Sequence, residues 1–378
     1  MKHLLRNAFA LLVCAAFCLG IGDGCQSDGH GRSHNDEFTD DGLLTANAAD
    51  LPGTLVTAHL DTPLPAGKNV LWCGSFQLAW NEACTLAGGK LQFRGAQPEL
   101  AASLNRQTFD SADVDAASYV ALAGYVREDI AHRIATQLKH KFGGHADPGL
   151  PTSFPGQRPQ DMVVYAYLFK NLEFPVPYER GESPASFGKE SVKCFGMGPD
   201  NKSGRAKMAA QTLIHDYVSA DDFVIEIQTK SPDDRLILAK VAPGKTLAQT
   251  VTAVQRRADL RSQSALASDV LVIPKTNFDI TRNYTELLGQ RLQPTTPAMA
   301  DDLTLLTAAQ NTRFQMDEKG VRLKSEAEMH YGCSSSMQVP QHVMIFDKPF
   351  LIMMSRKKAR QPYFALWVAN PELLVHAK

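Results

Sequence analysis

Apolar and polar residues alternate along residues 312–329, TRFQMDEKGVRLKSEAEM, but the apolar positions change parity partway through. Phe314 and Met316 occupy even positions, whereas the apolar and small residues after Gly320 occupy odd ones. Strict alternation predicts strands with one buried face, and a one-residue slip would move a whole apolar set to the wrong face. We therefore predict two strands separated by a turn or bulge at Asp317–Gly320. The second strand is either a fixed hairpin partner or a strand held in reserve.

Longer periodic segments predict a mixed α+β architecture. The run 69–87 predicts a buried strand that leads directly into a buried helix. Apolar residues spaced by threes and fours predict a long amphipathic helix over 113–142. The other predicted elements are strands at 162–170, 222–230 and 268–280, helices at 244–260 and 284–292, and two apolar strands joined by a basic turn at 342–371. The strand pairs concentrate toward the C-terminal end, which favours the α+β class.

The first 24 residues have the pattern of a secretory signal peptide. Lys2 and Arg6 flank the start of an apolar run at residues 8–22. This run is too short for a stable transmembrane helix but suits the core of a signal peptide. We therefore expect residues 1–24 to direct export and to be absent from the mature protein.

The residues that follow the signal predict a tether. Cys25 comes after a small glycine, as bacterial lipoprotein processing requires, but Gly22 stands where a leucine-type residue is usual. Lipidation of Cys25 therefore remains one alternative. Residues 25–50 are polar and aperiodic, as in a flexible linker, and we expect one domain at 51–378. The exported protein would be extracellular, periplasmic or held at a membrane by lipid.

Composition and cysteine content limit the function classes. The chain of 378 residues is 44% hydrophobic with a net charge of −1, so it can bury a large core and has no basic excess to attract nucleic acid. Of its seven cysteines, four lie in the predicted domain: Cys73, Cys84, Cys194 and Cys333. An exported protein can form disulfides, and four cysteines allow three full pairings.

One short motif resembles a metal site. In TLVTAHLDTPLPAG, His59 and Asp61 follow a predicted strand, as in the first metal motif of the di-zinc exopeptidases. Such a site also needs a bridging aspartate and an adjacent Glu-Glu pair, and neither occurs in a suitable context within residues 80–160. The common nucleophile, zinc and phosphate-loop motifs are missing as well. We therefore expect no catalytic residue, no metal and no cofactor, and the chain is not predicted to be an enzyme. A di-zinc exopeptidase that uses His59 and Asp61 is kept as a distant alternative, behind the two functions given below.

The order of motifs resembles the serpins. FQMDEKG, a loop, and then FDKPFLIMMSRKKARQPYFALWVANP are similar to the family's strand, Glu-x-Gly hinge, reactive-centre loop and closing hairpin. Upstream, VVYAYLFKNLEFPVPY resembles the central strand, VKCFGM its following segment, and DVLVIPKTNFDI the Pro-Lys strand. NVLWCGSFQLAW resembles the buried strand and helix under the main sheet. The chain is thus identified as similar to a divergent bacterial-type serpin.

The resemblance implies a single serpin-like domain of the α+β class, with a large central β-sheet, smaller sheets, surrounding helices and an exposed reactive-centre-type loop. The chain departs from the family at Tyr165, where an asparagine is usual, and at Leu172-Glu173, where a tryptophan is usual. The segment between Trp80 and Met162 is shorter than usual. Some peripheral helices or strands are therefore expected to be missing.

Serpins inhibit peptidases by keeping a strand in reserve, because cleavage of the loop lets it insert into the sheet. The resemblance assigns a reactive-loop hinge to Glu318, Gly320, Val321, Leu323, Ser325 and Ala327. It assigns a candidate scissile region to Ser334, Ser335, Ser336, Met337 and Gln338. Leu323 is bulky at a position where overpacking a sheet interior costs about 1–3 kcal/mol. Slow insertion would turn an inhibitor into a substrate.

The resemblance also places Cys194 and Cys333 toward the loop end of the molecule. A disulfide between them would tether the loop, and two unpaired thiols are the alternative.

Two functions follow, and the alternation that persists through Met329 favours the first. One is an exported inhibitor of serine or cysteine peptidases whose partner is an extracytoplasmic protease. The other is a non-inhibitory protein of the same fold with a binding or structural role. In both cases we expect a monomer with no nucleic-acid partner and no transmembrane span in the mature chain.

Overall fold

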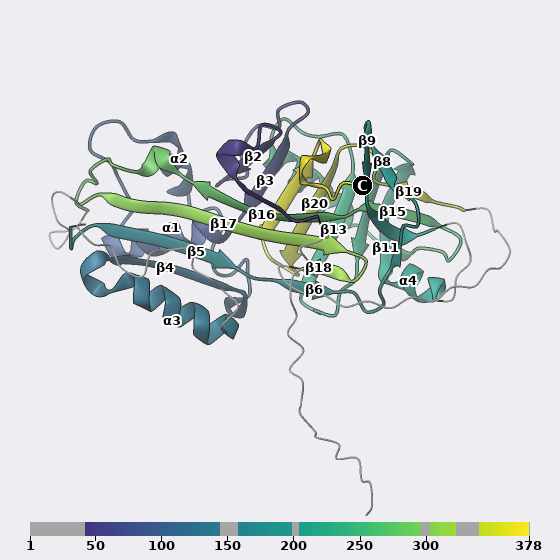
Figure 1. The fold of residues 1–378 in the computed structure, drawn as a ribbon, viewed down its shortest axis with the longest axis horizontal. Coiled ribbons are helices and arrows are strands. Elements are labelled where there is room, and N and C mark those ends of the chain that lie inside the picture. Colours follow the sequence, from purple (N-terminus) through teal and green to yellow (C-terminus); the bar gives the residue numbers. More distant parts are fainter. Residues whose placement is uncertain (1–41, 144–157, 199–203, 296–302, 323–339, 378) are drawn as a thin grey trace, which may run out of the picture. The chain divides into compact units, whose positions relative to one another are not determined.

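The computed structural model describes residues 42–143, 158–198, 204–295, 303–322 and 340–377. They belong to one compact unit that spans Asp36–Lys378. Large multi-stranded sheets dominate it, and few helices accompany them (Figure 1). The predicted α+β class with a large central sheet and smaller sheets is confirmed. No helix in the described part is long and apolar enough to cross a membrane.

The central sheet has seven strands. Its hydrogen-bonded order is β1-β16-β17-β18-β6, and β5 joins β17 on one side and β4 on the other. The strands are β1 (Leu44–Asn47), β4 (Tyr119–Tyr125), β5 (Met162–Leu168), β6 (Asn171–Glu173), β16 (Thr276–Asn283), β17 (Leu305–Asp317) and β18 (Gly320–Arg322). The long strand β17 pairs antiparallel with β16 over eight residues. It is therefore the central strand of this sheet.

An eight-stranded sheet packs against the central sheet. Its order is β14-β11-β12-β13-β20-β21-β3-β2. The strands are β2 (Thr54–Thr57), β3 (Asn69–Cys73), β11 (Thr212–Ser219), β12 (Asp222–Ile227), β13 (Asp234–Lys240), β14 (Gln263–Ser264), β20 (Phe350–Arg356) and β21 (Phe364–Val368). Phe314 of β17 stacks on Phe364 of β21 with 4.5 Å between ring centroids, so aromatic side chains join the two sheets.

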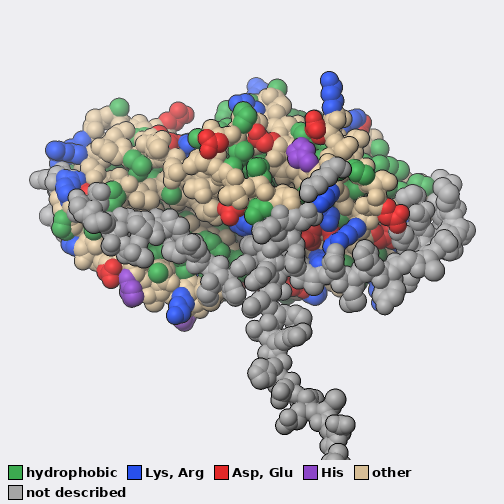
Figure 2. Space-filling model, viewed as in Figure 1, with side chains coloured by type: hydrophobic (Ala, Val, Ile, Leu, Met, Phe, Trp, Pro, Cys, Tyr) green, Lys and Arg blue, Asp and Glu red, His purple; other side chains and the backbone are tan. Residues whose placement is uncertain are grey.

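A four-stranded sheet has the order β19-β15-β10-β7. A two-stranded hairpin, β8-β9, lies close to it (Figure 1). The strands are β7 (Glu179–Arg180), β8 (Ala185–Phe187), β9 (Glu190–Val192), β10 (Cys194–Met197), β15 (Val270–Pro274) and β19 (Val343–Ile345). On the face shown in Figure 2, acidic and basic side chains are interspersed, in keeping with a net charge of −1.

Helices cover parts of these sheets. They are α1 (Ser75–Ala87), α2 (Glu99–Leu104), α3 (Ile130–Phe142), α4 (Arg205–Gln211) and α5 (Leu247–Ala258). Single 3-10 turns are η1 (Ala48–Asp50), η2 (Ala116–Ser118), η3 (Val126–Glu128), η5 (Thr285–Leu287) and η6 (Pro371–Leu373). The predicted strand-to-helix run at 69–87 is confirmed as β3 and α1. Thr246 caps α5 by accepting a hydrogen bond from the Gln249 N–H.

The predicted helix over 113–142 is wrong in its first half. Residues 119–125 form strand β4, and only Ile130–Phe142 are α-helical. On one face of β4, Val120 packs with α3, and on the other face Tyr125 packs with α1. Because both faces are covered by helices, β4 lacks the polar alternation that normally distinguishes a half-buried strand from a helix.

Three other predicted elements differ from the structure. The helix at 284–292 shrinks to the 3-10 turn η5, which soon reaches Gly289 with a positive φ of 72°. The single strand at 268–280 is two strands, β15 and β16, which belong to different sheets. Ordered structure also begins inside the predicted linker, because Leu44 of β1 packs against the core.

Candidate functional site: a fork in the central sheet

The central sheet divides at one point into two branches. In its N-terminal half β17 pairs in parallel with β5, from Leu305 opposite Met162 to Gln310 opposite Ala166. At its C-terminal end β17 pairs instead with β18, and β18 pairs with β6. Between these regions, residues 311–314 have no strand partner on that side within the described chain. We call this opening the fork; Figure 1 shows β18 lying between the ends of β17 and β6.

The turn predicted at Asp317–Gly320 is confirmed as a tight hairpin. Asp317 of β17 lies opposite Gly320 of β18, so Glu318 and Lys319 form a two-residue loop. The Asp317 carboxylate accepts a hydrogen bond from the Lys319 N–H at 2.9 Å. The carbonyl groups of the loop also accept hydrogen bonds from Phe174 and Tyr178, at 2.8 Å each. The hairpin is therefore held from both sides.

Gly320 allows β18 to approach β6 closely. A Cβ atom at this position would lie 2.5 Å from the carbonyl oxygen of Leu172 and 2.9 Å from the Cα of Glu173. Both of these atoms belong to the backbone, so they cannot move aside without breaking the ladder between β18 and β6. The glycine of the predicted hinge thus has a packing role.

Val321 fills the top of the fork. It lies opposite Met316 of β17 and Leu172 of β6, and its side chain is fully buried. The change of parity seen in the sequence follows from the two-residue loop, because it brings Met316 and Val321 to the same face of the sheet. The first buried residue of the predicted reserve strand is therefore already part of the sheet.

Two basic residues hold the hinge loop in place. The Glu318 carboxylate accepts hydrogen bonds from Lys275 Nζ and Arg180 Nε, each at 2.5 Å. Its side chain is only 5% exposed. Burial alone would raise the pKa of Glu318, but the hydrogen bonds from Lys275 and Arg180 and the charge of Lys275 outweigh it and hold the pKa below its usual value of 4.5.

We expect this ion cluster to make the free energy of unfolding depend on pH in the acid range. A carboxyl whose pKa is depressed by folding stabilises the folded state fully above about pH 4.5, and its contribution is lost as pH falls through the folded pKa. Glu318→Gln should therefore lower the free energy of unfolding by about 1–3 kcal/mol near pH 7 and by much less near pH 3. Urea unfolding from pH 3 to 7 measures this difference.

Glu286 supplies the control for this experiment. Its carboxylate pairs with Arg282 at 2.8 Å, but both side chains are partly exposed, at 40% and 28%. Such a pair contributes little to stability, so Glu286→Gln should cost well under 1 kcal/mol at every pH. A loss for Glu318→Gln that is equal at pH 3 and pH 7 would contradict the role given to the Glu318 ion cluster.

A buried ion pair lies beneath the fork. Lys170 Nζ donates a hydrogen bond to Asp234 Oδ2 at 2.9 Å, and the side chains are 9% and 3% exposed. The ammonium also lies 5.6 Å from the centre of the Tyr363 ring. Ser231 donates a further hydrogen bond to the same Asp234 oxygen at 2.6 Å. These contacts fix the segment that joins β5 to β6, which forms one arm of the fork.

The apex of the fork is a polar cluster around Gln310. Its amide nitrogen donates to the Cys73 carbonyl at 3.0 Å and to Ser75 Oγ at 2.8 Å. Tyr284 donates its hydroxyl hydrogen to Gln310 Oε1 at 2.7 Å. Because Gln310 is 1% exposed, these bonds satisfy its polar atoms away from water. They join β17 to β3, α1 and the segment after β16.

The structure brings together Glu318, Gly320 and Val321 of the predicted hinge. Leu323, Ser325 and Ala327 lie outside the described residues, and so do the predicted scissile residues 334–338 and Cys25. Cys194 is buried, and its thiol approaches the Ser183 carbonyl at 3.6 Å. Cys333 is also outside the described residues, so a disulfide between Cys194 and Cys333 stays a prediction.

The metal-like motif takes a different arrangement. Asp61 forms an ion pair with Arg106 at 2.7 Å, and His59 Nδ1 lies 3.5 Å from Thr62 Oγ1. Burial lowers the pKa of His59. The charge of Arg106 also lowers this pKa, whereas the charge of Asp61 raises it by a smaller amount than burial lowers it. Among the residues that the structure describes, no group of three or more His, Cys, Asp or Glu side chains could hold a metal ion.

Sequence reasoning missed the residues that support the hinge, namely Arg180, Lys275, Lys170 and Asp234. A lysine directly after an apolar strand, as at Lys275, is a signal that could have marked one of them. Charged residues at the ends of buried strands need partners, because burial of an unpaired charge is costly.

Comparisons with known proteins give structural likenesses only. No family model and no curated protein sequence matches the chain. The chain aligns with Serpin48 of the insect Tenebrio molitor at 12% identity and a TM-score of 0.47, over 80% of this chain and 92% of that one. It aligns with Serpin-12 of Manduca sexta at 14% identity and a TM-score of 0.41, over 65% and 66%. For human thyroxine-binding globulin with thyroxine the values are 15%, 0.37, 65% and 64%. Likeness at these identities concerns the fold alone.

Proposed function

We propose that this protein is an exported peptidase inhibitor of the serpin type, in which the loop after Arg322 inserts into the fork once a peptidase has cleaved it. The observation that carries the proposal is the pairing of β18 on both edges. Gly320–Arg322 bond to β17 on one side and to β6 on the other, so the strand already lies inside the sheet. A fixed surface hairpin would need only the first of these pairings.

The register of the fork favours a longer inserted strand. Each residue added beyond Arg322 moves one position back along β17 and one position back along the β6-β5 arm. The resulting neighbours are Phe314 and Lys170 for Leu323, Thr312 and Leu168 for Ser325, and Gln310 and Ala166 for Ala327. The last pair is already directly opposite in the structure. The two arms are therefore in register for a strand to enter between them.

Beyond Leu323 the inward side chains of this strand become smaller toward the apex of the fork. The order is Val321, Leu323, Ser325 and Ala327, and small side chains pass most easily between closing strands. Leu323 would meet Phe314 and Lys170, both of which are large and buried. We expect this position to slow insertion, so a fraction of the inhibitor should be consumed as substrate in each encounter.

Cleavage of the loop is expected to stabilise the protein strongly. A light nick between Met329 and Pro340 should raise the midpoint of thermal unfolding by tens of degrees, because the freed strand adds two ladders of backbone hydrogen bonds. The mature chain, nicked and intact, is compared by calorimetry under the same conditions. A nick after Gly143, in the connector between α3 and β5, provides the control and should not raise the midpoint.

The same experiment separates the two functions. A raised midpoint together with a peptidase complex that survives denaturation would support inhibition. An unchanged or lower midpoint would contradict insertion, and a binding or structural role would then be the better account of the fold. The target peptidase would be found by incubating the protein with serine and cysteine peptidases of differing specificity and sequencing the cleaved bond.

A further inference from the structure

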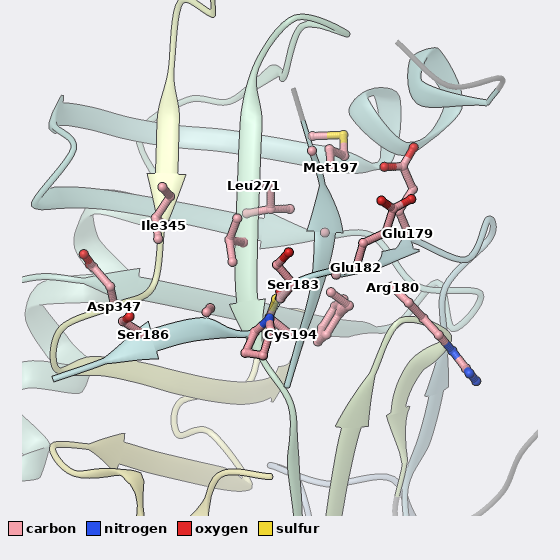
Figure 3. A pocket seen from close by; sticks show the side chains of 17 residues that line it. Glu179, Arg180, Glu182, Ser183, Ser186, Cys194, Met197, Leu271, Ile345 and Asp347 are labelled. Carbon is pink, nitrogen blue, oxygen red and sulfur yellow. The ribbon is translucent and has the colours of Figure 1, made fainter. Parts of the chain in front are cut away.

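A cavity lies beside the basic turn that joins β20 to β21. Its volume is about 640 Å³, within the range of small-molecule sites. Its lining comes from strands β11, β12 and β13, from the residues after α5, and from Lys357 and Lys358 of the turn. We call it the turn cavity. The cavity in Figure 3 is a different one beside the four-stranded sheet, and its Arg180 binds Glu318 of the hinge.

The acidic side chains of the turn cavity already have basic partners. Glu226 Oε2 lies 2.9 Å from His215 Nε2 and accepts a hydrogen bond from Arg235 Nε at 2.9 Å. Arg235 also donates a hydrogen bond to Asp259 at 2.7 Å. Asp234 is held by the buried ion pair beneath the fork. The negative charges of the lining are therefore engaged within the protein itself.

Two lysines of the lining have no such partner. Lys357 and Lys358 are exposed, and within the described residues neither ammonium group forms an ion pair or a hydrogen bond. Arg360, a further exposed cation of the turn, binds Asp110 and lies outside the lining. The charge that the cavity offers to a ligand is therefore positive, and it lies at the end formed by the turn.

Hydrogen bonds to the backbone fix this turn. The Lys357 N–H donates to the Asp233 carbonyl at 2.7 Å, and the Arg360 N–H donates to Asp113 Oδ1 at 3.0 Å. The Asp113 side chain is only 1% exposed, so the far end of the turn is anchored in the interior. The two lysines therefore extend from a fixed backbone, which lowers the conformational cost of binding a ligand.

Lys358 occupies a position where lysine is unfavourable. Its φ is 69°, in the left-handed region. Glycine adopts this conformation freely and asparagine tolerates it, whereas a lysine there is strained. The strain is not offset by an ion pair or a hydrogen bond of the side chain within the described chain. A strained residue of this kind points to a function for its side chain.

We propose that the turn cavity binds a small organic phosphate. The phosphate group would lie against the ammonium groups of Lys357 and Lys358, which bind it as point charges. The polar body of the molecule would face Gln228 and Ser262, which line the cavity and whose side chains form no hydrogen bond within the described residues. The site requires neither the Glu318 hinge nor insertion of the loop.

Three glucose compounds test the proposal, because they share one sugar and differ in charge. Titration calorimetry of the intact mature chain with glucose 6-phosphate should show saturable binding at about pH 7.5, where the phosphate carries nearly two charges. Glucose 6-sulfate, with one charge, should bind about threefold more weakly or worse, and glucose should not bind. Glycerol 3-phosphate repeats the test with a smaller body. Absence of saturable binding by both phosphates, or equal binding of glucose, would overturn the proposal.

Two variants of the turn locate the site. Lys358→Asn should weaken binding of glucose 6-phosphate about fivefold or more, while its unfolding midpoint stays the same or rises, because asparagine tolerates the positive φ. Arg360→Gln removes one charge from the same turn outside the lining, so it is the matched control and should keep the affinity within about twofold. Wild-type affinity in Lys358→Asn, or equal weakening in both variants, would contradict the site.

Discussion

Replacement of Val321 by aspartate is expected to abolish the thermal stabilisation that follows cleavage of the loop. Val321 is fully buried, and its partners in the two neighbouring strands, Met316 and Leu172, are both apolar and cannot pair with a charge. A carboxylate there would lose its hydration without a partner, which costs far more than β18 contributes. The first residues of the strand should therefore leave the fork, and the rest of the loop could not follow them.

The measurement compares four samples, namely wild type and Val321→Asp, each intact and nicked between Met329 and Pro340. The wild-type midpoint should rise by tens of degrees on nicking, whereas the midpoint of the variant should change by only a few degrees. Val321→Ala is the matched control, because it shortens the side chain and keeps it apolar, so most of the rise should remain. A full rise in nicked Val321→Asp would contradict entry of the strand through the fork.

Replacement of Lys170 by methionine is expected to lower the free energy of unfolding by about 3–5 kcal/mol. The pair with Asp234 has side chains that are 9% and 3% exposed, so loss of the ammonium leaves a buried carboxylate without its ionic partner. Methionine retains the length of the apolar stem, so the cost arises from charge rather than from a cavity. Urea unfolding at pH 7 measures the change.

A second substitution tests that cause. In Lys170→Met with Asp234→Asn, the remaining side chain is neutral, so the double variant should be more stable than Lys170→Met alone. The exposed pair of Lys230 and Glu173, at 2.7 Å with side chains 59% and 39% exposed, is the comparison on the same arm of the fork. Lys230→Met should cost under 1 kcal/mol. A double variant less stable than Lys170→Met would show that the Asp234 charge is not the source of the loss.

Local sequence patterns predicted the elements whose apolar residues lie on one face only. The parity change around Asp317–Gly320 was visible because each strand places its apolar residues on a single face, so they recur at every second position of the sequence. The same logic failed for β4, which is covered by α1 on one face and α3 on the other. A strand buried on both faces carries no alternating signal, and the threefold and fourfold spacing of its large residues then resembles a helix.

The partners of the hinge could not be predicted from local patterns. Glu318 was assigned to the hinge by the resemblance of Glu318-x-Gly320 to the family's Glu-x-Gly motif, but Arg180 is 138 positions away from Glu318 and Lys275 is 43 positions away. Only the assembled sheets bring these three together, because Lys275 lies between β15 and β16 where the chain passes from one sheet to another.

The apex of the fork would divide the proposed strand entry into two kinetic stages. Residues 323–326 would enter an opening where β17 has no partner to displace, so within this stage the bulk of Leu323 is what opposes entry. From Ala327 onward the strand must first separate Ala166 from Gln310, and every later step breaks an existing pair before two new ones form. A further barrier to the proposed insertion would then lie at the fifth residue beyond Arg322. Whether insertion is completed before the peptidase is released would then depend on how tightly β5 and β17 hold together at that point rather than on the cleaved bond itself.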